Sequence, residues 1–345
     1  MPRPSIASDT NERRALLDAV AGLQNYVPEM KQVAARRRLL FSHMSARHQR
    51  LVKATGYSRR LQDIDKAVTA NGEITARIAK LAERDYNVTR AELLHSRAVR
   101  NARVIELLKH FVRDWSEVGD RERSITFPPI LDALQAEFGN DIAEKRVLVP
   151  GAGVGRLAYE ISQLGCRTEA NEYSHLMHLG NIFVLEQSKN SCSVYPYVHN
   201  FSHQISGKEQ LRPVLFPDVE PENKIRISNS FGDFMRLTGS QHMYDAVATL
   251  FFIDTAENML TYIDTIHQLL PPGGIWLNTG PLKWGSSPRV EFTLEEVLIV
   301  IAKMGFKIEK RWSKKAEYTA DSEGLWHGFY GIEGWVARKI EDSSV

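Results

Sequence analysis

The sequence predicts an α/β protein in which a helical region precedes a parallel, doubly wound sheet. In residues 11–116, apolar side chains recur at helical spacing, and Gly and Pro are rare. From residue 146 onward, short apolar runs alternate with helical patterns, which is typical of βαβ units. A chain of 345 residues has room for such a domain and an extension. We therefore predict a helical region over residues 1–116 and a sheet domain over residues 117–345.

The helical region shows its periodicity at both ends. Near its start, Leu16, Val20 and Leu23 follow one another at intervals of three to four residues. The corresponding apolar positions near its end are Ile105, Leu107, Leu108 and Phe111. Asp114–Ser116 and the polar stretch Glu117–Ser124 follow, and we expect a loop there.

The first half of the sheet domain is expected to begin with a strand at Arg146–Pro150, followed by a helix at Leu157–Leu164. A second strand is expected at Arg167–Asn171 and a long helix at His175–Gln187. The segment Tyr195–Lys224 contains four prolines, and we expect an irregular insertion there, before the fourth strand of the sheet.

The second half begins with the apolar run Tyr244–Ile253, which predicts a buried strand. A helix at Met259–Leu270, a turn at Pro271–Gly274 and a strand at Ile275–Asn278 are expected to follow. Thr293–Met304 is amphipathic and predicts a helix that stops at Gly305. The last two expected strands, which we pair as a hairpin, are Phe306–Arg311 and Trp335–Lys339.

Charge and composition argue against a nucleic-acid partner. Hydrophobic residues make up 43% and charged residues 25% of the chain, as in an ordinary globular protein. Lys and Arg total 44 against 42 Asp and Glu, so we expect no nucleic-acid partner. The basic runs Arg36–Arg38 and Arg59–Arg60 are interpreted as solvated helix faces, with a nucleic-acid- or protein-binding surface as the alternative.

The cysteine pattern and the chain's start predict the compartment. Cys166 and Cys192 form no CxxC pair and have no His at metal-ligand spacing, so we expect a reducing compartment and no metal site. The start, Met1–Ser5, lacks an apolar signal core, and no window has the apolar length of a membrane span. We predict a cytoplasmic protein without a membrane partner, and leave nuclear entry and a homodimer open.

A glycine loop joins the first expected strand to its helix. Gly151, Gly153 and Gly155 follow a G-x-G-x-G spacing, and glycine lets the backbone approach a ligand closely. Loops that hold a pyrophosphate usually have the longer G-x-G-x-x-G spacing, so this loop favours a nucleoside without phosphates. A tight turn that binds no ligand remains the alternative.

Three further elements agree with a nucleoside. Glu172 lies 17 residues after Gly155, at the end of the second strand, where a carboxylate would accept hydrogen bonds from both ribose hydroxyls. Gly232-Asp233-Phe234 precedes the buried strand, a location suited to adenine, and Pro271–Gly274 resembles a turn found after the fourth helix in methyltransferases. In this order they predict S-adenosylmethionine as the ligand.

Motifs along the chain resemble the carnosine N-methyltransferase family in order and spacing, between about Asn101 and Ile340. The matching runs are Val149–Ala158, Asn171–Ser174, Phe251–Ala256, Asn278–Leu282, Phe111–Ser116 and Phe216–Val219. The resemblance implies a Rossmann-like class I methyltransferase domain after a helical extension. It also implies methyl transfer from S-adenosylmethionine to the N-pros imidazole nitrogen of carnosine, which gives anserine.

The same resemblance implies the cofactor contacts. They fall on Arg113, Gly151, Glu172, Asp233 and Phe234. Two more family positions carry different residues here: a Gln three residues before the Arg is His110, and a Cys before the Phe-Phe pair is Leu250.

Asp254 is our candidate catalytic residue, because it directly follows the buried strand and should lie at the carboxyl edge of the sheet. A carboxylate that accepts one imidazole N–H fixes the tautomer of the ring and stabilises the cation formed by methylation. Its alternative role is an N-cap for a helix that begins at Thr255. The resemblance adds Phe251, Tyr318 and Tyr330 as residues that line the methyl-acceptor site.

Two positions depart from the family's acceptor pocket. The family's His after the Gly-Pro-Leu motif is Gly285 here, and one Tyr of its C-terminal cluster is Gly328. Both changes widen the pocket and remove hydrogen-bond partners. Of the neighbouring residues, Trp284 and Trp326 are expected to be packing residues, and His327 an exposed loop residue.

The sequence thus predicts an S-adenosylmethionine-dependent N-methyltransferase that acts on the imidazole of carnosine or of a related histidine-containing small molecule or peptide. A methyltransferase for another small amine, thiol or secondary metabolite is the alternative. A binding module with a vestigial site is a third hypothesis.

Overall fold

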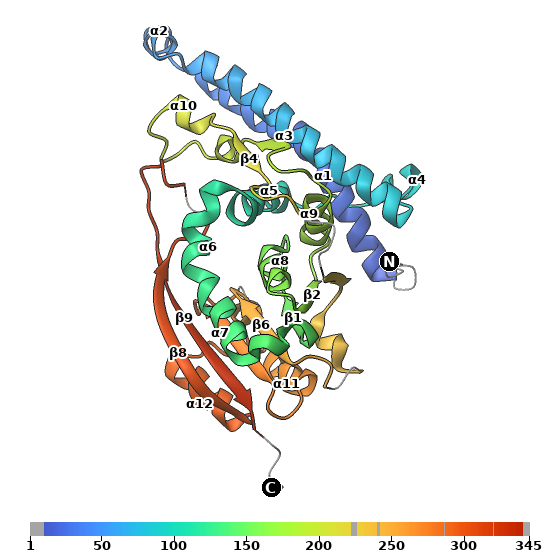
Figure 1. Ribbon diagram of the computed structural model, residues 1–345. Coiled ribbons are helices and arrows are strands. Elements are labelled where there is room, and N and C mark those ends of the chain that lie inside the picture. Colours follow the sequence, from blue (N-terminus) through green and yellow to red (C-terminus); the bar gives the residue numbers. More distant parts are fainter. Residues whose placement is uncertain (1–9, 222–225, 240–241, 286, 320, 341–345) are drawn as a thin grey trace. The chain divides into compact units, whose positions relative to one another are not determined.

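The computed structural model describes residues 10–221, 226–239, 242–285, 287–319 and 321–340 (Figure 1). These residues belong to two units. The helical unit consists of Met1–Val118, Leu179–Pro221 and Thr319–His327, and the sheet unit of Gly119–His178, Glu222–Tyr318 and Gly328–Val345. The boundary that we place between residues 116 and 117, as the start of a catalytic domain, stays a prediction.

The helical unit is built on two long helices that pack along each other, α1 (Thr10–Ser42) and α3 (Tyr57–Tyr86) (Figure 1). Their apolar faces are buried, as the helical spacing predicts. Gly72 leaves room for a side chain of α1, because a Cβ at Gly72 would lie 2.2 Å from the Val27 Cγ2 atom. The remaining helices before the sheet unit are α2 (Ala46–Ala54), α4 (Arg90–Leu93) and α5 (Asn101–Trp115).

Asn71 links the long helices to the insertion. Its side-chain amide donates to the Tyr26 hydroxyl and to the Tyr195 carbonyl, each at 3.0 Å, and its oxygen accepts from the Tyr195 amide at 2.7 Å. The Tyr26 hydroxyl also contacts Nε2 of His199 at 2.7 Å. Asn71 is completely buried, so these hydrogen bonds are made away from water, where an unpaired partner would be costly.

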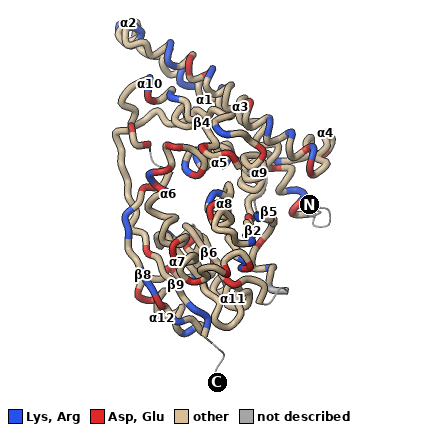
Figure 2. The backbone as a smooth tube through the Cα atoms, in the orientation of Figure 1, with Lys and Arg blue, Asp and Glu red and all other residues tan. Residues whose placement is uncertain are grey.

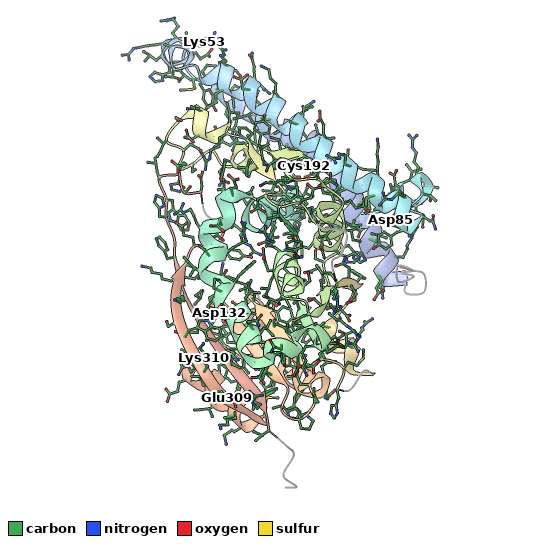
Figure 3. The ribbon with its side chains drawn as sticks, in the orientation of Figure 1. Lys53, Asp85, Asp132, Cys192, Glu309 and Lys310 are labelled. Atoms are coloured by element: carbon green, nitrogen blue, oxygen red, sulfur yellow. The ribbon has the colours of Figure 1, made fainter. Side chains whose placement is uncertain are left out.

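Residues 192–216, most of which belong to the expected insertion, contribute short elements to the helical unit. They are β3 (Cys192–Val194), η3 (Pro196–His199), α10 (Gly207–Gln210) and β4 (Val214–Phe216), with β3 and β4 paired antiparallel. Cys192, labelled in Figure 3, lies in β3, which packs on α3. Cys192 and Cys166 are both buried free thiols.

The arginine runs of the first third make contacts within the helical unit. Arg38 pairs with Asp65, and the Arg37 guanidinium lies 3.5 Å from the centre of the Phe201 ring. Arg59 lies within 4.0 Å of Asp63 one turn along α3. Positive and negative residues are both scattered along the chain (Figure 2). The interpretation of the runs as solvated helix faces stays a prediction.

The sheet unit contains a seven-stranded sheet in the order β5-β2-β1-β6-β7-β9-β8. Its parallel strands are β1 (Arg146–Pro150), β2 (Arg167–Glu172), β5 (Ile227–Phe231), β6 (Ala246–Leu250) and β7 (Ile275–Gly280). The predicted C-terminal hairpin is confirmed: β8 (Phe306–Ala316) and β9 (Tyr330–Lys339) are antiparallel, and β9 also pairs antiparallel with β7.

Alternation along the strands builds two cores, one on each face of the sheet. Val147 and Val149 pack with helices α7 (Pro128–Phe138) and α8 (Arg156–Gln163), whereas Leu148 packs on the other face. That second core also takes in α11 (Met259–Leu269) and α12 (Leu294–Lys303). Helices thus cover both faces of the sheet. A ligand-binding site is therefore expected at the carboxyl ends of the parallel strands.

The loop that we expect before the sheet domain is not found. The expected loop of residues 114–124 is wrong: Asp114 and Trp115 are the last residues of α5, and the stretch after them forms the 3-10 turn η1 (Glu117–Gly119) and the helix α6 (Asp120–Thr126). Asp120 and Glu122 lie in the first turn of α6, where acidic groups stabilise the helix dipole. Glu122, Arg123 and Thr126 are buried, so tertiary packing rather than apolar periodicity produces this helix.

Three strands were not predicted: the short strands β3 and β4 and, in the seven-stranded sheet, the edge strand β5. The sequence of β5, Ile-Ser-Asn-Ser-Phe, is mostly polar, and all five residues are half-buried or exposed. An edge strand needs little apolar character, so it leaves a weak signal in the sequence. The insertion precedes the fourth strand of the sheet, β6, with β5 between them. Helix α9 (His175–Leu185) follows β2 as expected.

Within the described residues, no helix has both the length and the apolar character required to cross a bilayer. The same residues contain no group of three or more His, Cys, Asp and Glu side chains that could hold a metal ion.

Candidate active site

The glycine loop connects β1 to α8 through three residues with positive φ. The φ angles of Gly151, Gly153 and Gly155 are 63°, 58° and 84°, a region that disfavours residues with a Cβ. A Cβ on Gly151 would lie 2.3 Å from Cδ2 of Phe252, whereas a Cβ on Gly153 would meet nothing within 4 Å. The turn at Gly153 therefore leaves open space beside the backbone, which a ligand can approach.

Glu172 lies beside this loop, because the last residues of β1 and β2 pair as Pro150 with Asn171. One carboxylate oxygen accepts the Gly153 amide at 2.7 Å, and the other accepts the Ser174 amide at 2.7 Å. The side chain is buried. A carboxylate held by two backbone donors has a fixed orientation, and hydroxyl groups form strong hydrogen bonds with such a charged acceptor.

The next strand end, after β5, contributes Asp233 and Phe234. The Glu172 carbonyl accepts the Gly232 amide at 3.0 Å, which places this turn next to the acid. Asp233 Oδ1 accepts the Met235 amide at 3.0 Å and so fixes the turn. The buried Phe234 ring packs edge-on against Phe252 and Tyr262, with ring centres 5.3 and 4.8 Å away.

The turn after β6 is strained. Phe251 has a φ of 50°, and its amide donates to the Thr279 carbonyl at 2.9 Å. The neighbouring strand approaches closely there, since a Cβ on Gly280 would lie 3.1 Å from the Phe251 nitrogen. Left-handed backbone at a bulky residue is uncommon and persists where surrounding structure enforces it, often at functional sites. Leu250, the predicted cofactor residue before it, is the last residue of β6 and is half-buried.

Asp254 lies in the 3-10 turn η5 (Ile253–Thr255) and is 6% exposed. Its Oδ2 accepts the Lys283 amide at 2.9 Å. Burial raises the pKa of Asp254 above its ordinary value, although the backbone hydrogen bonds and the Lys283 charge oppose the effect. The alternative role as a helix N-cap is wrong, because α11 begins at Met259 and Asn258 caps it.

Aromatic side chains form a chain that begins at Phe251, three residues before Asp254 in the sequence. The rings of Phe251 and Tyr318 have centres 4.9 Å apart, and Tyr318 lies 6.5 Å from Tyr330 in an edge-on arrangement. The Lys283 ammonium lies 5.7 Å from the centre of the Tyr330 ring. The three predicted acceptor-site aromatics thus form one group with a cation at its end.

The residues around the two glycine departures differ in role. Gly285 donates to the Asp254 carbonyl at 3.1 Å, and its nearest neighbours lie 3.9 Å from where a Cβ would be, so space is open there. Gly328 is half-buried, two residues before β9. Trp284 packs as predicted, with its indole donating to the Phe292 carbonyl at 3.0 Å.

The predictions for the loop that precedes β9 had mixed outcomes. Trp326 is 61% exposed, so the expectation of a packing residue is wrong there. Trp326 follows a short turn and belongs to no helix or strand. Its ring lies at the surface. The expected exposure of His327 is confirmed.

His110 and Arg113 lie in α5 of the helical unit. Arg113 forms two hydrogen bonds with the adjacent Asp114, Nε to Oδ1 at 2.7 Å and Nη2 to Oδ2 at 3.0 Å. Burial would raise the pKa of Asp114, but the charge of Arg113 and the contact with His110 hold it below its usual range. Burial and the charge of Arg113 lower the pKa of His110 below its usual value, although the contact with Asp114 opposes the effect. Their predicted cofactor contacts remain predictions.

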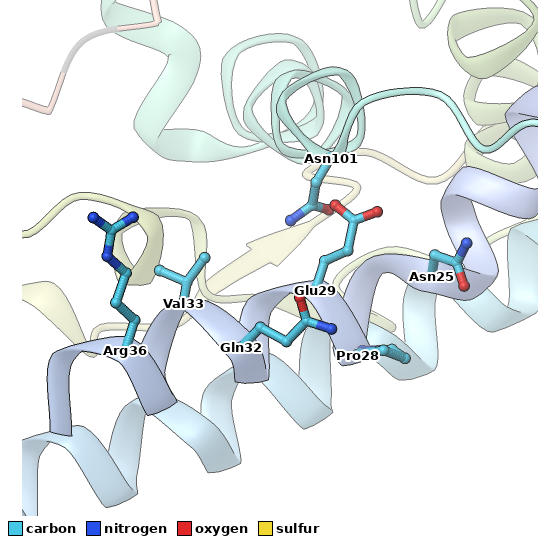
Figure 4. Close-up of a pocket in the computed structure, with 7 residues that line it drawn as sticks. All are labelled: Asn25, Pro28, Glu29, Gln32, Val33, Arg36 and Asn101. Atoms are coloured by element: carbon cyan, nitrogen blue, oxygen red, sulfur yellow. The ribbon is translucent and has the colours of Figure 1, made fainter. Parts of the chain in front are cut away.

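Three cavities of the described residues, two in the helical unit and one in the sheet unit, contain none of the predicted site residues. One, of about 670 Å³, lies in the helical unit along α1 (Figure 4) and is lined by Asn25, Pro28, Glu29, Gln32, Val33, Arg36 and Asn101. Figure 4 shows Glu29 and Asn101 directed toward each other from α1 and α5. The cavity of the sheet unit, of about 350 Å³, lies at the amino ends of the strands and is lined partly by Lys145, Asp245 and Gly274. Sites in such sheets lie at the opposite edge.

Sequence reasoning missed three residues of the candidate site. Phe252 and Tyr262 stack with ring centres 4.9 Å apart and back the glycine loop and Phe234. Lys283 contacts both Asp254 and Tyr330. The Phe-Phe pair at 251–252 is a visible signal for Phe252, whereas no pattern in the sequence indicates Tyr262 or Lys283.

The sheet order, the glycine loop and the acid at the end of β2 define an S-adenosylmethionine-dependent methyltransferase of the α/β class. Comparison with known proteins narrows this class. The family model described as carnosine N-methyltransferase matches residues 90–341, and the chain belongs to this family.

Individual relatives agree. The carnosine N-methyltransferase of Schizosaccharomyces pombe is 32% identical over 361 residues, which cover 96% of this chain and 97% of that protein. The carnosine N-methyltransferase of Mus musculus is 38% identical over 67% of this chain and 62% of its own length. Among solved structures, the magnesium protoporphyrin IX methyltransferase of Synechocystis with bound S-adenosylmethionine is 14% identical over 62% of this chain and 77% of that chain, with a TM-score of 0.39.

Proposed function

We propose that this chain methylates the imidazole of carnosine, or of a related histidine-containing small molecule or peptide, with S-adenosylmethionine as the donor. The observation that carries the proposal is the buried carboxylate of Asp254, at the carboxyl edge of the sheet beside the aromatic group of Phe251, Tyr318 and Tyr330. Membership of the carnosine N-methyltransferase family supports the acceptor class.

The residues of the sheet unit suit the proposed donor. The Glu172 carboxylate would accept hydrogen bonds from the ribose hydroxyls, and the open backbone at Gly153 allows the nucleoside to approach. The Asp233 carboxylate and the buried Phe234 would bind the adenine, by analogy with the family positions on which they fall. S-adenosylmethionine supplies an activated methyl group, so the chain's own contribution is positioning, electrostatics and exclusion of water.

Asp254 orients the acceptor in this proposal. An imidazole can be methylated only at a ring nitrogen that has a lone pair, so the proton must reside on the other nitrogen. Among the described residues, only the backbone amides of Lys283 and of Asp254 itself donate to this carboxylate, so it retains capacity to accept the imidazole N–H. Its negative charge also stabilises the imidazolium that methylation produces.

A different methyl acceptor is the second candidate. The open space beside Gly285 favours it, because a wider pocket with fewer hydrogen-bonding side chains selects its substrate less strictly. An amine or thiol that needs no oriented ring proton would depend little on Asp254. Comparison of wild type with Asp254→Asn therefore discriminates between the candidates.

The test is a methyl-transfer assay with a labelled donor against carnosine, histidine, histidine peptides, small amines and thiols. We expect turnover of imidazoles, with the product methylated on the ring. Binding of S-adenosylmethionine is measured in parallel by calorimetry. This measurement distinguishes a protein that does not bind the donor from one that binds the donor but does not methylate the acceptors offered. Donor binding without turnover of any imidazole would overturn the proposal.

A further inference from the structure

Lys283 is attached to Asp254 by its backbone. It follows β7, and its amide donates to Asp254 Oδ2 at 2.9 Å. Two residues on, the Gly285 amide donates to the Asp254 carbonyl at 3.1 Å. These two bonds fix the segment 283–285 to the turn that contains Asp254. The base of the Lys283 side chain therefore has a defined position next to the proposed catalytic carboxylate.

The Lys283 side chain extends to the far end of the aromatic group. Its ammonium lies 5.7 Å from the centre of the Tyr330 ring. The hydrogen bond with Tyr330 raises the pKa of Lys283 above its usual value, with smaller contributions from Tyr318 and Asp254. The ammonium thus stays charged over the whole physiological range of pH. Lys283 is exposed, and it forms no ion pair with a carboxylate among the described residues.

We infer that Lys283 determines acceptor specificity by pairing with a carboxylate on the same molecule that carries the imidazole. This inference rests on the proposed function. The aromatic rings of Phe251, Tyr318 and Tyr330 form the surface for a planar imidazole, and Asp254 accepts its N–H. A cation near the end of this group complements a negative charge a few bonds away from the ring.

This arrangement selects among imidazoles. Free histidine, a dipeptide and a peptide that ends in histidine each present a carboxylate close to the ring. A histidine inside a polypeptide, or an imidazole whose carboxylate is blocked as an amide, offers only a neutral group to Lys283. The expected substrate class is therefore a small imidazole acid or a peptide with a C-terminal histidine.

The test compares carnosine with its C-terminal amide, using wild type, Lys283→Met and Lys283→Arg. Methionine removes the charge but keeps the backbone amide that binds Asp254. We expect wild type to prefer the acid in kcat/KM on the order of 10-fold, a typical value for a charge-assisted hydrogen bond. Lys283→Met should lower kcat/KM for carnosine to the value for its amide. The change should come from a higher KM, with kcat nearly unchanged. Lys283→Arg should restore most of the preference.

Lys315→Met is the matched control, because Lys315 is also exposed and its ammonium lies 4.9 Å from the centre of the Phe329 ring. It should retain the preference of wild type for the acid. Equal preference in wild type and Lys283→Met, or an equal loss for both substrates, would overturn the inference while leaving the proposed function intact. Failure of every imidazole to react, in wild type with bound donor, would overturn the proposed function and this inference with it.

Discussion

The backbone amide of Lys283 donates a hydrogen bond to the buried carboxylate of Asp254 at 2.9 Å, across 29 residues of sequence. The bond joins the turns that follow β6 and β7, so two neighbouring strand ends position one charged oxygen. It also leaves the side chain of Lys283 free to extend toward Tyr330. One short segment thereby supports both the proposed catalytic group and the proposed specificity group.

Asp254→Asn should lower kcat with an imidazole acceptor by about 100- to 10,000-fold, the usual contribution of a positioned acid–base group. Asparagine has the same size and retains an oxygen for the Lys283 amide, but it cannot stabilise the imidazolium. Steady-state kinetics with saturating donor measures the effect. Asp264→Asn, an exposed change on α11, is the control and should leave kcat unaltered. A comparable kcat in both variants would contradict the role of Asp254.

The raised pKa of Asp254 predicts opposite effects of pH on activity and stability. The active form is the carboxylate, so kcat should fall on acidification at a higher pH than an ordinary Asp, with a pKa of 3.8, would cause. In the folded protein, ionising this buried group costs free energy. The stability that the protonated carboxyl group contributes at low pH is therefore lost as pH rises through the raised pKa. Asp254→Asn should therefore be at least as stable as wild type at neutral pH, which thermal unfolding at pH 7 measures.

Glu172→Gln should weaken S-adenosylmethionine binding by about 10- to 100-fold, the usual cost of losing charged hydrogen bonds. Both carboxylate oxygens accept backbone amides, from Gly153 and Ser174, so the NH₂ group of glutamine would face a donor. Calorimetry gives the Kd. The control is Glu144→Gln, whose side chain is 78% exposed and should bind the donor as wild type does. An unchanged Kd in Glu172→Gln would remove this residue from the cofactor site.

Alanine at two glycines of the loop should separate folding from binding. Gly151→Ala places a Cβ 2.3 Å from Phe252 Cδ2, so the free energy of unfolding should fall by about 2–4 kcal/mol from overpacking and backbone strain. Gly153→Ala meets no atom within 4 Å, so only strain of about 1 kcal/mol is expected. Urea unfolding measures both.

Donor binding should fall clearly in Gly153→Ala despite its small loss of stability, because the new methyl group occupies the open space beside the loop. Calorimetry on the folded variant tests this expectation. Donor affinity equal to wild type would show that the nucleoside does not approach the loop at Gly153.

Asn71→Ala should lower the free energy of unfolding by about 3 kcal/mol or more, since it leaves buried partners at Tyr26 and Tyr195 without their hydrogen bonds. Chemical denaturation measures the change. Gln24→Ala, which removes an exposed hydrogen bond with Glu83, should cost less than about 0.5 kcal/mol. Similar losses in the two variants would show that the buried network contributes little.

His175 should make the protein less stable in mild acid. Burial, with a smaller effect of His178, lowers the pKa of His175 from 6.5 to about 3. Between these values the unfolded chain binds the proton more readily, so stability falls as pH drops from 6.5 toward 3. From pH 7 to pH 5, wild type should lose about 2 kcal/mol more than His175→Gln. Urea unfolding at both pH values measures the difference, and equal losses would contradict the prediction.

Strong local patterns made much of the fold predictable. The strand at Arg146–Pro150 is found as expected, because apolar residues buried on both faces leave a continuous apolar run. The edge strand β5 and the helix α6 were missed because both are mostly polar. Pairing with β2 produces the strand β5, and the packing of polar side chains produces the helix α6.

The sequence by itself determined the glycine loop and the position of Glu172, because backbone geometry requires glycine at positive φ and the acid must stand at the end of the second strand. It also determined the family, through motifs that follow one another at fixed spacing. Only the tertiary structure decided that Asp254 is bonded to Lys283 rather than capping a helix, and that Lys283 lies at the end of the aromatic group. These relationships depend on which strand ends are neighbours in the sheet, and residues far apart in sequence meet only when the sheet has formed.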